Sequence, residues 1–380
     1  MKRLSLLFPA IFILCSCTNQ IQSNDFLVEK TEKFSGSTKF SELLSHYRLI
    51  PLETKPECLI GGNVAKISED NDLIYINSDN NRLLVFDRTG RFVRQIASQG
   101  PGPEEYTLLR DFDVSKNQIA ILDINKVNLY SLEGIFKKSI ELPEIGGNIK
   151  LLPNNNIMLR TGGEDPILII NEEGKIIDRF LNLDQVIQIA KHTPFGVWQG
   201  EICFQNGGFG NDIWLYNPTK RQGRLLKLIN EGKTLNVEEE NKLIKEVGFK
   251  YTSNQDLCII GELASTESHL VFCSKYQKHL YINILNAMAG DGVRYEIYPN
   301  SQIEDNITFV GTNICLQYVY ALSSSQKYFY SYIYPFIINE SIKDYNGENM
   351  ESAYQQITEL IRGLPDIENA NPILFEFNFK

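Results

Sequence analysis

The sequence has little positive charge for its size. Its 37 Lys and Arg residues are outnumbered by 47 Asp and Glu residues, which gives a formal net charge of −10 over 380 residues. A nucleic-acid partner needs a basic face that neutralises phosphates, so this balance argues against such a partner. The 43% of apolar residues indicate a folded protein with a large core and exclude a disordered chain.

The residue patterns that mark common catalytic and metal sites are also missing. The four histidines, His46, His192, His269 and His279, lie far apart and form no HxxxH or HxH pair. No GxSxG segment offers the nucleophile elbow of an α/β-hydrolase. The sequence therefore predicts no cofactor and no metal site, and the isolated histidines are interpreted as ordinary surface or core residues.

The cysteines that follow the N-terminal region show no CxxC pair and no regular spacing. There are five of these cysteines, so at least one thiol stays unpaired if the others form disulfides. We interpret them as small buried apolar residues of strands. They are Cys58, Cys203, Cys258, Cys273 and Cys315.

The apolar run at the N-terminus is too short to cross a membrane, but it carries a targeting signal. Lys2 and Arg3 precede the run Leu4 to Leu14, which is followed by Cys15-Ser16-Cys17. The small residue before Cys17 resembles a bacterial lipobox, which predicts a signal peptide at residues 1–16 and a lipidated Cys17. An ordinary secretory signal is the alternative. Cys15 is a poorer acceptor because the large residues before it do not suit a cleavage site.

The segment after Cys17 is polar and rich in Ser, Asn and Lys. We expect residues 17–45 to form a flexible tether that lets the domain stand off the membrane. Thr18 takes the place of the Asp that retains lipoproteins at the inner membrane under the enterobacterial sorting rule. The prediction is therefore an outer-membrane location in the cell envelope, with the periplasmic and surface sides both open.

One stretch, residues 97–114, organises the rest of the chain. It is a Gly- and Pro-rich loop between two short runs that alternate apolar and polar residues, the pattern of half-buried strands. Gly100 and Gly102 allow backbone angles closed to other residues, and Pro101 and Pro103 fix their own φ angles. The strands and turns before this loop recur in the same order after it, which indicates a repeat.

The repeat has a period of about 42 residues and about four short strands in each unit. Residues 60–64 read IGGNV and residues 145–149 read IGGNI, 85 residues further on. The turn glycines Gly90, Gly134 and Gly174 are 44 and 40 residues apart. A four-stranded sheet cannot bury both of its faces alone, so such units stack radially into a β-propeller.

The predicted fold is all-β: a six-bladed β-propeller of four-stranded antiparallel blades over residues 46–380, with two short helical insertions. One helix is expected near residues 236–247 and another at residues 352–361, each with a capping box at its start. The sixth unit lacks one strand, and residues 47–53 form a spare strand. We therefore expect the N-terminal strand to pair with the last blade and close the ring.

The units resemble the NHL-type propeller repeat. The matching segments are the Gly-Pro-Gly loop with Glu104, Glu105 and Tyr106, the strand ending in Asp123, and the turn from Asp87 to Gly90. The lipobox at Cys17 and the repeats over residues 46–380 together resemble the six-bladed β-propeller lipoproteins of Bacteroidetes. The resemblance implies a fold and an envelope location, and it implies no activity or site residues.

Two functions remain open at this point. The first is a membrane-tethered, non-enzymatic module that binds or scaffolds a protein or a glycan. The second is a propeller hydrolase or lyase acting on sugars, metal-dependent and lactonase-like, which needs several polar side chains converging on the central channel. The Glu104–Glu105 pair could bind a cation, but a solvated loop is the favoured interpretation.

The predicted binding face is the one where the longer links between strands emerge. Loops there combine polar groups, flexible glycines and an aromatic residue. Arg110, at the mouth of the channel, is the expected anchor because its guanidinium presents a rigid fork of donors. The candidate residues are Asn80, Glu104, Glu105, Arg110, Glu164, Asp165, Asn206 and Phe209.

Overall fold

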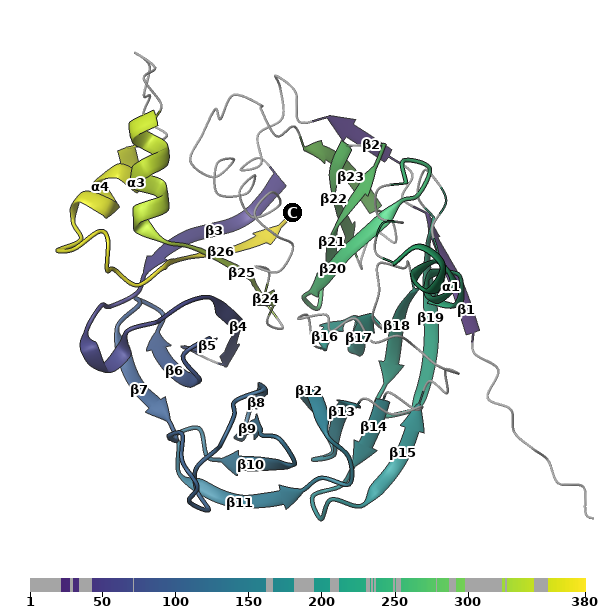
Figure 1. Cartoon of the computed structure of the whole chain (residues 1–380), viewed down its shortest axis with the longest axis horizontal. Coiled ribbons are helices and arrows are strands. Elements are labelled where there is room, and N and C mark those ends of the chain that lie inside the picture. The colour runs from purple at the N-terminus through teal and green to yellow at the C-terminus, as the bar shows by residue number, and fades with distance from the viewer. Residues whose placement is uncertain are drawn as a thin grey trace, which may run out of the picture.

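The fold is a ring of six blades around a central axis, seen in the computed structural model of the chain (Figure 1). Each blade has four antiparallel strands in sequence order from the centre outward, except where the ring closes. This confirms the predicted six-bladed β-propeller. The structure describes residues 22–27, 30–33, 43–70, 72–161, 167–180, 195–205, 212–229, 233, 235, 237–248, 250, 254–277, 279–286, 292–297, 323–324, 327–344 and 355–380.

The first three blades follow the regular repeat. Blade 1 consists of β4 (Val64–Asp70), β5 (Leu73–Ser78), β6 (Arg82–Asp87) and β7 (Phe92–Ile96). Blade 2 consists of β8 (Asp111–Ser115), β9 (Gln118–Leu122), β10 (Lys126–Tyr130) and β11 (Phe136–Glu141). Blade 3 consists of β12 (Gly146–Leu151), β13 (Ile157–Thr161), β14 (Ile167–Ile170) and β15 (Ile176–Phe180).

The last three blades carry the irregular features. Blade 4 consists of β16 (Gly196–Trp198), β17 (Glu201–Gln205), β18 (Asp212–Asn217) and β19 (Gln222–Ile229). Blade 5 consists of β20 (Ile259–Ser265), β21 (His269–Tyr276), β22 (His279–Asn286) and β23 (Gly292–Ile297). Blade 6 consists of β24 (Ser323–Ser324), β25 (Phe329–Ile333), β26 (Ile373–Phe379) and β3 (Leu44–Pro51).

Blade 6 closes the ring with strands from both ends of the chain, as the sequence predicted. β3 pairs antiparallel with β26, with Pro51 opposite Ile373 and Tyr47 opposite Phe377. β3 begins at Leu44, two residues before residue 46, where the sequence predicts that the propeller begins. The C-terminal residue is also fixed, because the Lys380 amide donates to the Leu43 carbonyl at 3.0 Å.

Two runs inside the expected tether are strands, which corrects that expectation for these residues. β1 (Gln22–Leu27) pairs parallel with β19, and β2 (Lys30–Lys33) pairs parallel with β23. An outer propeller strand leaves a row of N–H and C=O groups unpaired, and these two runs bond to such rows. The targeting residues 1–21, including Cys17, lie outside the described residues.

The core is divided among the seams between blades. Six clusters of buried apolar side chains occupy the six seams, one between each pair of neighbouring blades. In β6, Leu83 and Val85 face blade 2, whereas Leu84 and Phe86 face blade 6. The period of two thus buries both faces of a blade, which explains why its inner strands read as unbroken apolar runs.

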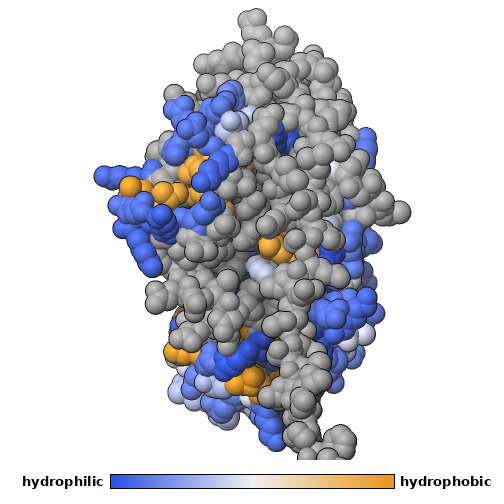
Figure 2. Space-filling view, turned by 90° about the vertical axis from the view of Figure 1, so that its right-hand side faces the viewer, coloured by the Kyte–Doolittle hydropathy of each residue, from blue (hydrophilic) through white to orange (hydrophobic). Residues whose placement is uncertain are grey.

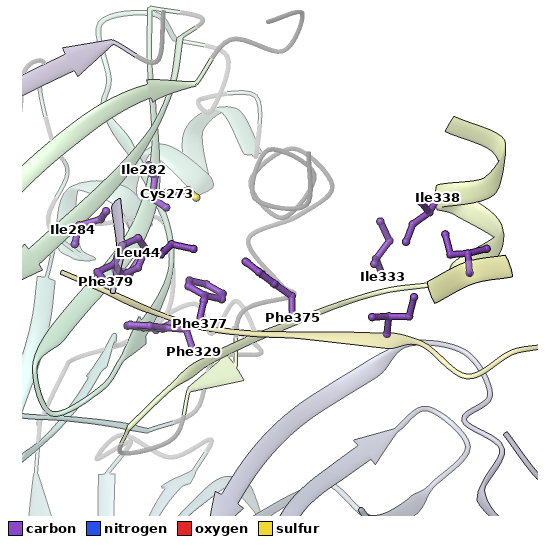
Figure 3. Close-up of a cluster of buried hydrophobic side chains, with 14 residues drawn as sticks. Leu44, Cys273, Ile282, Ile284, Phe329, Ile333, Ile338, Phe375, Phe377 and Phe379 are labelled. Atoms are coloured by element: carbon purple, nitrogen blue, oxygen red, sulfur yellow. The ribbon is translucent and has the colours of Figure 1, made fainter. Parts of the chain in front are cut away.

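The seam between blades 5 and 6 is built around four phenylalanines. Phe329, Phe375, Phe377 and Phe379 pack from β25 and β26 toward blade 5, where Ile282 and Ile284 meet them (Figure 3). The rings of Phe375 and Phe377 stack with centroids 4.9 Å apart, and those of Phe377 and Phe379 meet edge to face at 5.6 Å. Such ring pairs add to the free energy of burial.

The helices lie in two insertions, as expected, but the second insertion holds two of them. α1 (Val237–Val247) lies between blades 4 and 5. α3 (Pro335–Asp344) and α4 (Gln355–Arg362) lie between β25 and β26, and the sequence predicted only the latter. Among the described residues, none of these helices is long and apolar enough to cross a membrane.

Candidate binding face

Successive links between antiparallel strands come to opposite ends of each blade, so the propeller has two different faces. We call one the loop face; it carries the links from outermost to next innermost strand and from second to third strand. Both helical insertions lie in links of this kind. The other, the turn face, carries the links from first to second strand and from third to fourth strand. The outer strands of the blades lie along the perimeter of the ring (Figure 1).

The turn face repeats one compact turn in four blades. In blade 1, Asp87 Oδ1 accepts the amides of Thr89 at 2.8 Å and Arg91 at 3.1 Å, and Gly90 has φ +86°. This confirms the predicted Asp-x-x-Gly turn. Ser131, Asn171 and Asn217 cap the corresponding turns of blades 2, 3 and 4.

The loop that follows blade 1 is held closed by one of its own predicted site residues. Glu105 Oε2 accepts the Gly102 amide at 2.8 Å, and Glu105 Oε1 accepts the Ser98 hydroxyl at 3.2 Å. A Cβ on Gly100 would lie 2.1 Å from Glu105 Oε2, so a side chain at this position would displace the Glu105 carboxylate from the loop. The Glu105 carboxylate therefore holds the loop closed. The sequence pattern favoured a solvated carboxylate and did not predict this role.

Neighbouring blades fix the same loop in space. Tyr106 donates its hydroxyl to the Asn81 carbonyl at 2.9 Å, and Tyr130 donates its hydroxyl to the Glu104 carbonyl at 2.9 Å. Burial raises the pKa of both tyrosines to about 12, so both remain neutral donors in the physiological range. The side chain of Glu104 itself is exposed.

The Asp at the end of β9 binds this loop to the next link. Asp123 Oδ2 accepts the Thr107 amide at 2.9 Å, and Oδ1 accepts the amides of Leu108 at 2.9 Å and Ile124 at 2.8 Å. Asp123 is only 2% exposed, so these amides are its main contacts. This Asp, which ends the second strand of the repeat, therefore fixes both the preceding loop and the link that follows it.

The remaining predicted residues of the face divide into described and undescribed ones. Asn80 is exposed and donates to the Leu59 carbonyl at 3.1 Å. Arg110 is exposed and donates to the Gly146 carbonyl of blade 3 at 3.1 Å. Asn80, Glu104, Glu105 and Arg110 thus all belong to the links of blades 1 to 3. The other candidates, Glu164, Asp165, Asn206 and Phe209, lie outside the described residues.

Four exposed aliphatic side chains were not anticipated on this face. They are Leu59 (42% exposed), Leu108 (43%), Ile124 (38%) and Ile145 (57%), and we call them the aliphatic arc. Hydrogen bonds connect the links that carry them: Asn80 bonds to Leu59, Asp123 joins Leu108 to Ile124, and the Leu142 amide donates to Asn125 at 2.8 Å. The arc therefore runs over blades 1 to 3 on a framework that is already rigid.

Charged side chains of the innermost strands are paired with one another. Lys66 of β4 bonds to Asp111 of β8 at 2.9 Å, and Lys150 of β12 bonds to Asp113 of β8 at 3.0 Å. The other carboxylate oxygens accept the backbone amides of Ile149 and Leu151. These groups tie the inner strands of three blades together. The described residues contain no group of three or more His, Cys, Asp or Glu side chains arranged to hold a metal ion.

A second polar cluster, which we call the closure clasp, lies where blade 6 meets blade 1. Its centre is the Glu376 carboxylate of β26, whose side chain is fully buried. Arg48 of β3 donates to both carboxylate oxygens at 2.8 and 3.1 Å, and Arg88 of blade 1 pairs with Oε2 at 2.7 Å. His46 and Tyr330 also bond to Glu376, at 2.9 and 2.8 Å.

The clasp is completed by blade 1. Arg88 and Tyr330 both bond to the Glu69 carboxylate at the end of β4. Burial alone would raise the pKa of the Glu376 carboxyl, but hydrogen bonds from Arg48, His46 and Tyr330 and the charge of Arg88 lower it. Because these bonds join β3 and β26 of blade 6 to β4 and the perimeter turn of blade 1, we interpret the clasp as a device that closes the ring, and His46 is a partner in it.

The described cysteines match their interpretation. Cys58, Cys203, Cys258 and Cys273 are buried and form no disulfide. Cys315 lies outside the described residues.

The strand order defines the chain as a six-bladed β-propeller whose longer links and helical insertions lie on the loop face. The family model described as Domain of unknown function (DUF4934) matches residues 25–377, and the chain belongs to that family. The match begins within β1, so it includes both N-terminal strands that pair with the perimeter.

Solved structures show the same fold at low sequence identity. A candidate exported protein of Bacteroides fragilis NCTC 9343 is 20% identical with a TM-score of 0.70, over 93% of this chain and 99% of that one. A member of the DUF4221 family from Bacteroides vulgatus ATCC 8482 is 10% identical with a TM-score of 0.53, over 89% and 97% of the two chains. No curated protein matches the chain.

Proposed function

We propose that this chain is a lipid-anchored module of the cell envelope that binds a protein partner through the loop face over blades 1 to 3. The observation that carries the proposal is the aliphatic arc. Four exposed aliphatic side chains lie on links that hydrogen bonds join to neighbouring blades. Exposed apolar side chains with charged residues such as Glu104 and Arg110 on the same links are typical of a protein interface, in which a polar rim surrounds an apolar centre.

The proposed location depends on the N-terminus. The lipobox that ends at Cys17 supports lipid anchoring, and Thr18 supports the outer membrane. The similarity to a candidate exported protein of Bacteroides fragilis is consistent with an envelope protein. Residues 1–16 would then be removed as a signal peptide.

The apolar character of the arc favours a protein over a glycan. Aliphatic anchors bury apolar area against a partner, and each fully buried Leu or Ile is worth about 1.5–3 kcal/mol. Arg110 lies among them as a donor for a partner's carbonyl or carboxylate groups. The alternative hydrolase or lyase acting on sugars gains no support from the inner strands, where Asp111 and Asp113 are paired with lysines.

Site-specific photo-crosslinking in the native organism tests the proposal. A benzoyl-phenylalanine at Leu108 or Ile124 should form a discrete crosslinked product with a protein of the envelope. The matched control is Ile135, which is 68% exposed beside the perimeter turn of blade 2. Equal crosslinking from Ile135, or none from Leu108 and Ile124, would contradict the proposed face.

The anchor is tested separately. A Cys17→Ala variant should neither incorporate fatty acid nor fractionate with membranes. Incorporation of label by that variant would refute lipidation at Cys17.

A further inference from the structure

The N-terminal region follows the perimeter of the propeller through three consecutive blades. β1 lies beside the outer strand of blade 4, β2 beside that of blade 5, and β3 is itself the outer strand of blade 6 (Figure 1). We call these three strands the perimeter belt. Only residues 28 and 29 separate β1 from β2, so the belt passes from one blade to the next without a long connection.

The start of the belt lies at a defined point on the perimeter. Gln22 is opposite Arg224, the third residue of β19, immediately after the perimeter turn of blade 4 (Asn217–Arg221). Cys17 precedes Gln22 by five residues in the sequence. Because a residue extends the chain by at most about 3.5 Å, Cys17 lies within about 17 Å of that point.

We infer that the perimeter of blade 4 is the surface of the propeller that lies against the membrane. This inference rests on the proposed lipidation of Cys17. A lipid at Cys17 holds its own residue at the bilayer surface, and the short chain to Gln22 brings the perimeter of blade 4 there. Blade 1 lies three blades away on the opposite side of the ring (Figure 1), so its perimeter and the start of the aliphatic arc point away from the lipid.

The chemistry of this perimeter suits contact with headgroups. Lys220 and Arg221 lie in the turn beside the start of β1; Lys220 is exposed, and the half-exposed Arg221 pairs with Asp178 of blade 3 at 3.4 Å. Basic side chains near a bilayer attract anionic lipid phosphates, by about 1 kcal/mol each. Among the described residues on this side, hydrophilic ones predominate and the hydrophobic ones form small separate groups (Figure 2). The described part of this side therefore suits contact with headgroups better than insertion into the bilayer.

The repeat supplies a set of matched positions for measuring the orientation. In each of four blades one exposed residue follows the turn cap by two positions and donates its amide to that cap. These residues are Thr89, Glu133, Glu173 and Thr219, in blades 1, 2, 3 and 4. Each is changed singly to Cys in full-length lipidated protein that carries Cys315→Ser; the cysteines Cys58, Cys203, Cys258 and Cys273 are buried.

The four proteins are labelled with a fluorophore and reconstituted in vesicles that contain lipid with a quencher on its headgroup. We expect the strongest quenching at Thr219, less at Glu173, and several-fold less at Glu133 and Thr89. A flat series, or one with Thr89 quenched most, would overturn the orientation. If the protein carries no lipid and does not remain bound to the vesicles, both the proposed anchor and the orientation are overturned.

A second variant tests whether the belt sets the orientation. A flexible Gly/Ser linker of 20 residues inserted after residue 21 should leave the protein in the vesicles but abolish the difference between Thr219 and Thr89. An unchanged difference would show that another surface orients the propeller, and would overturn the role of the belt.

Discussion

The links between strands are held in place differently on the two faces of this propeller. On the turn face the side chain of each cap bonds within its own turn: the Asp87 carboxylate accepts the amides of Thr89 and Arg91, and the caps in blades 2 to 4 also accept amides of their own turns. On the loop face the links depend on their neighbours, as when Asp123 of blade 2 holds the amides of the preceding loop.

This difference shows where the repeat is constrained and where it is free. A turn of this kind needs a short polar cap and a residue with positive φ, which is Gly90, Gly134, Gly174 or Arg221, so it recurs from blade to blade. A link held by other blades tolerates insertions, and the helices α1, α3 and α4 all lie in such links. Exposed aliphatic residues and insertions on the same face are what a recognition surface on a fixed scaffold requires.

The largest expected effect comes from breaking the closure clasp. Glu376→Gln removes the fully buried negative charge that pairs with Arg48 and Arg88, whose side chains are 34% and 20% exposed. Breaking a fully buried ion pair on one side typically costs about 3–5 kcal/mol of unfolding free energy, so with partly exposed cations we expect a loss toward the lower end of that range. Urea unfolding measures the loss. The matched control is Glu173→Gln at an exposed turn position, expected to change stability by less than about 0.5 kcal/mol.

The clasp also predicts a pH dependence with a definite sign. In the folded protein the hydrogen bonds from Arg48, His46 and Tyr330 hold the pKa of Glu376 below its ordinary value of 4.5. Its contribution is therefore fully present above the unfolded value and is lost as the pH falls through the folded value. The stability difference between wild type and Glu376→Gln should shrink below about pH 4.5. A difference that stays constant or grows on acidification would contradict this account.

The next effect concerns a glycine of the turn face. Gly90 has φ +86°, and a Cβ there would lie 2.1 Å from the Pro51 carbonyl of the closing strand. Gly200 has φ +71°, with no atom within 4 Å of its Cβ position. Backbone strain alone costs about 1–2 kcal/mol for Ala at either site. Gly90→Ala should therefore lower the unfolding free energy clearly more than Gly200→Ala, and equal losses would show that the turn does not press on blade 6.

A pair of aspartates compares the two faces directly. Asp123→Ala leaves three amides of the loop face without an acceptor, which should cost about 1–3 kcal/mol. Asp87→Ala exposes its amides to water within one turn and should cost about 1 kcal/mol or less. Hydrogen exchange should rise over residues 99–109 in the Asp123 variant and only over residues 87–91 in the Asp87 variant. Faster exchange of a neighbouring blade in the Asp87 variant would contradict the contrast.

The repeat made the fold predictable, because its signals are local. In blades 1 to 3 the cap and the glycine of the perimeter turn lie three residues apart, and the spare strand predicted at residues 47–53 matched a strand missing from the last unit. α3 was missed because its sequence, PFIINESIKD, contains three Ile residues and follows directly on β25, so it resembles a strand. β1 and β2 were missed because a strand added at the perimeter is paired on one side only and needs no apolar alternation.

The site was harder to predict, because its contacts join distant segments. Arg48, Glu69 and Glu376 meet only when the register of β3 on β26 is known. A signal did exist: Glu376 interrupts an apolar strand, ILFEFNF, and a charge in such a strand requires a buried partner.

The smallest effect on stability should accompany the largest effect on binding. Leu108 and Ile124 are exposed, and Ser at either position removes apolar surface that the folded chain leaves in water. The unfolding free energy should change by no more than about 0.5 kcal/mol for Leu108→Ser, Ile124→Ser and the control Ile135→Ser. The partner identified by crosslinking should nevertheless bind the first two variants about tenfold or more weakly, because each loses about 1.5–3 kcal/mol of buried anchor. Ile135→Ser should bind as wild type does. If Ile135→Ser weakens binding as much as Leu108→Ser, the recognition surface extends to the turn face, and the division of labour between the two faces does not hold.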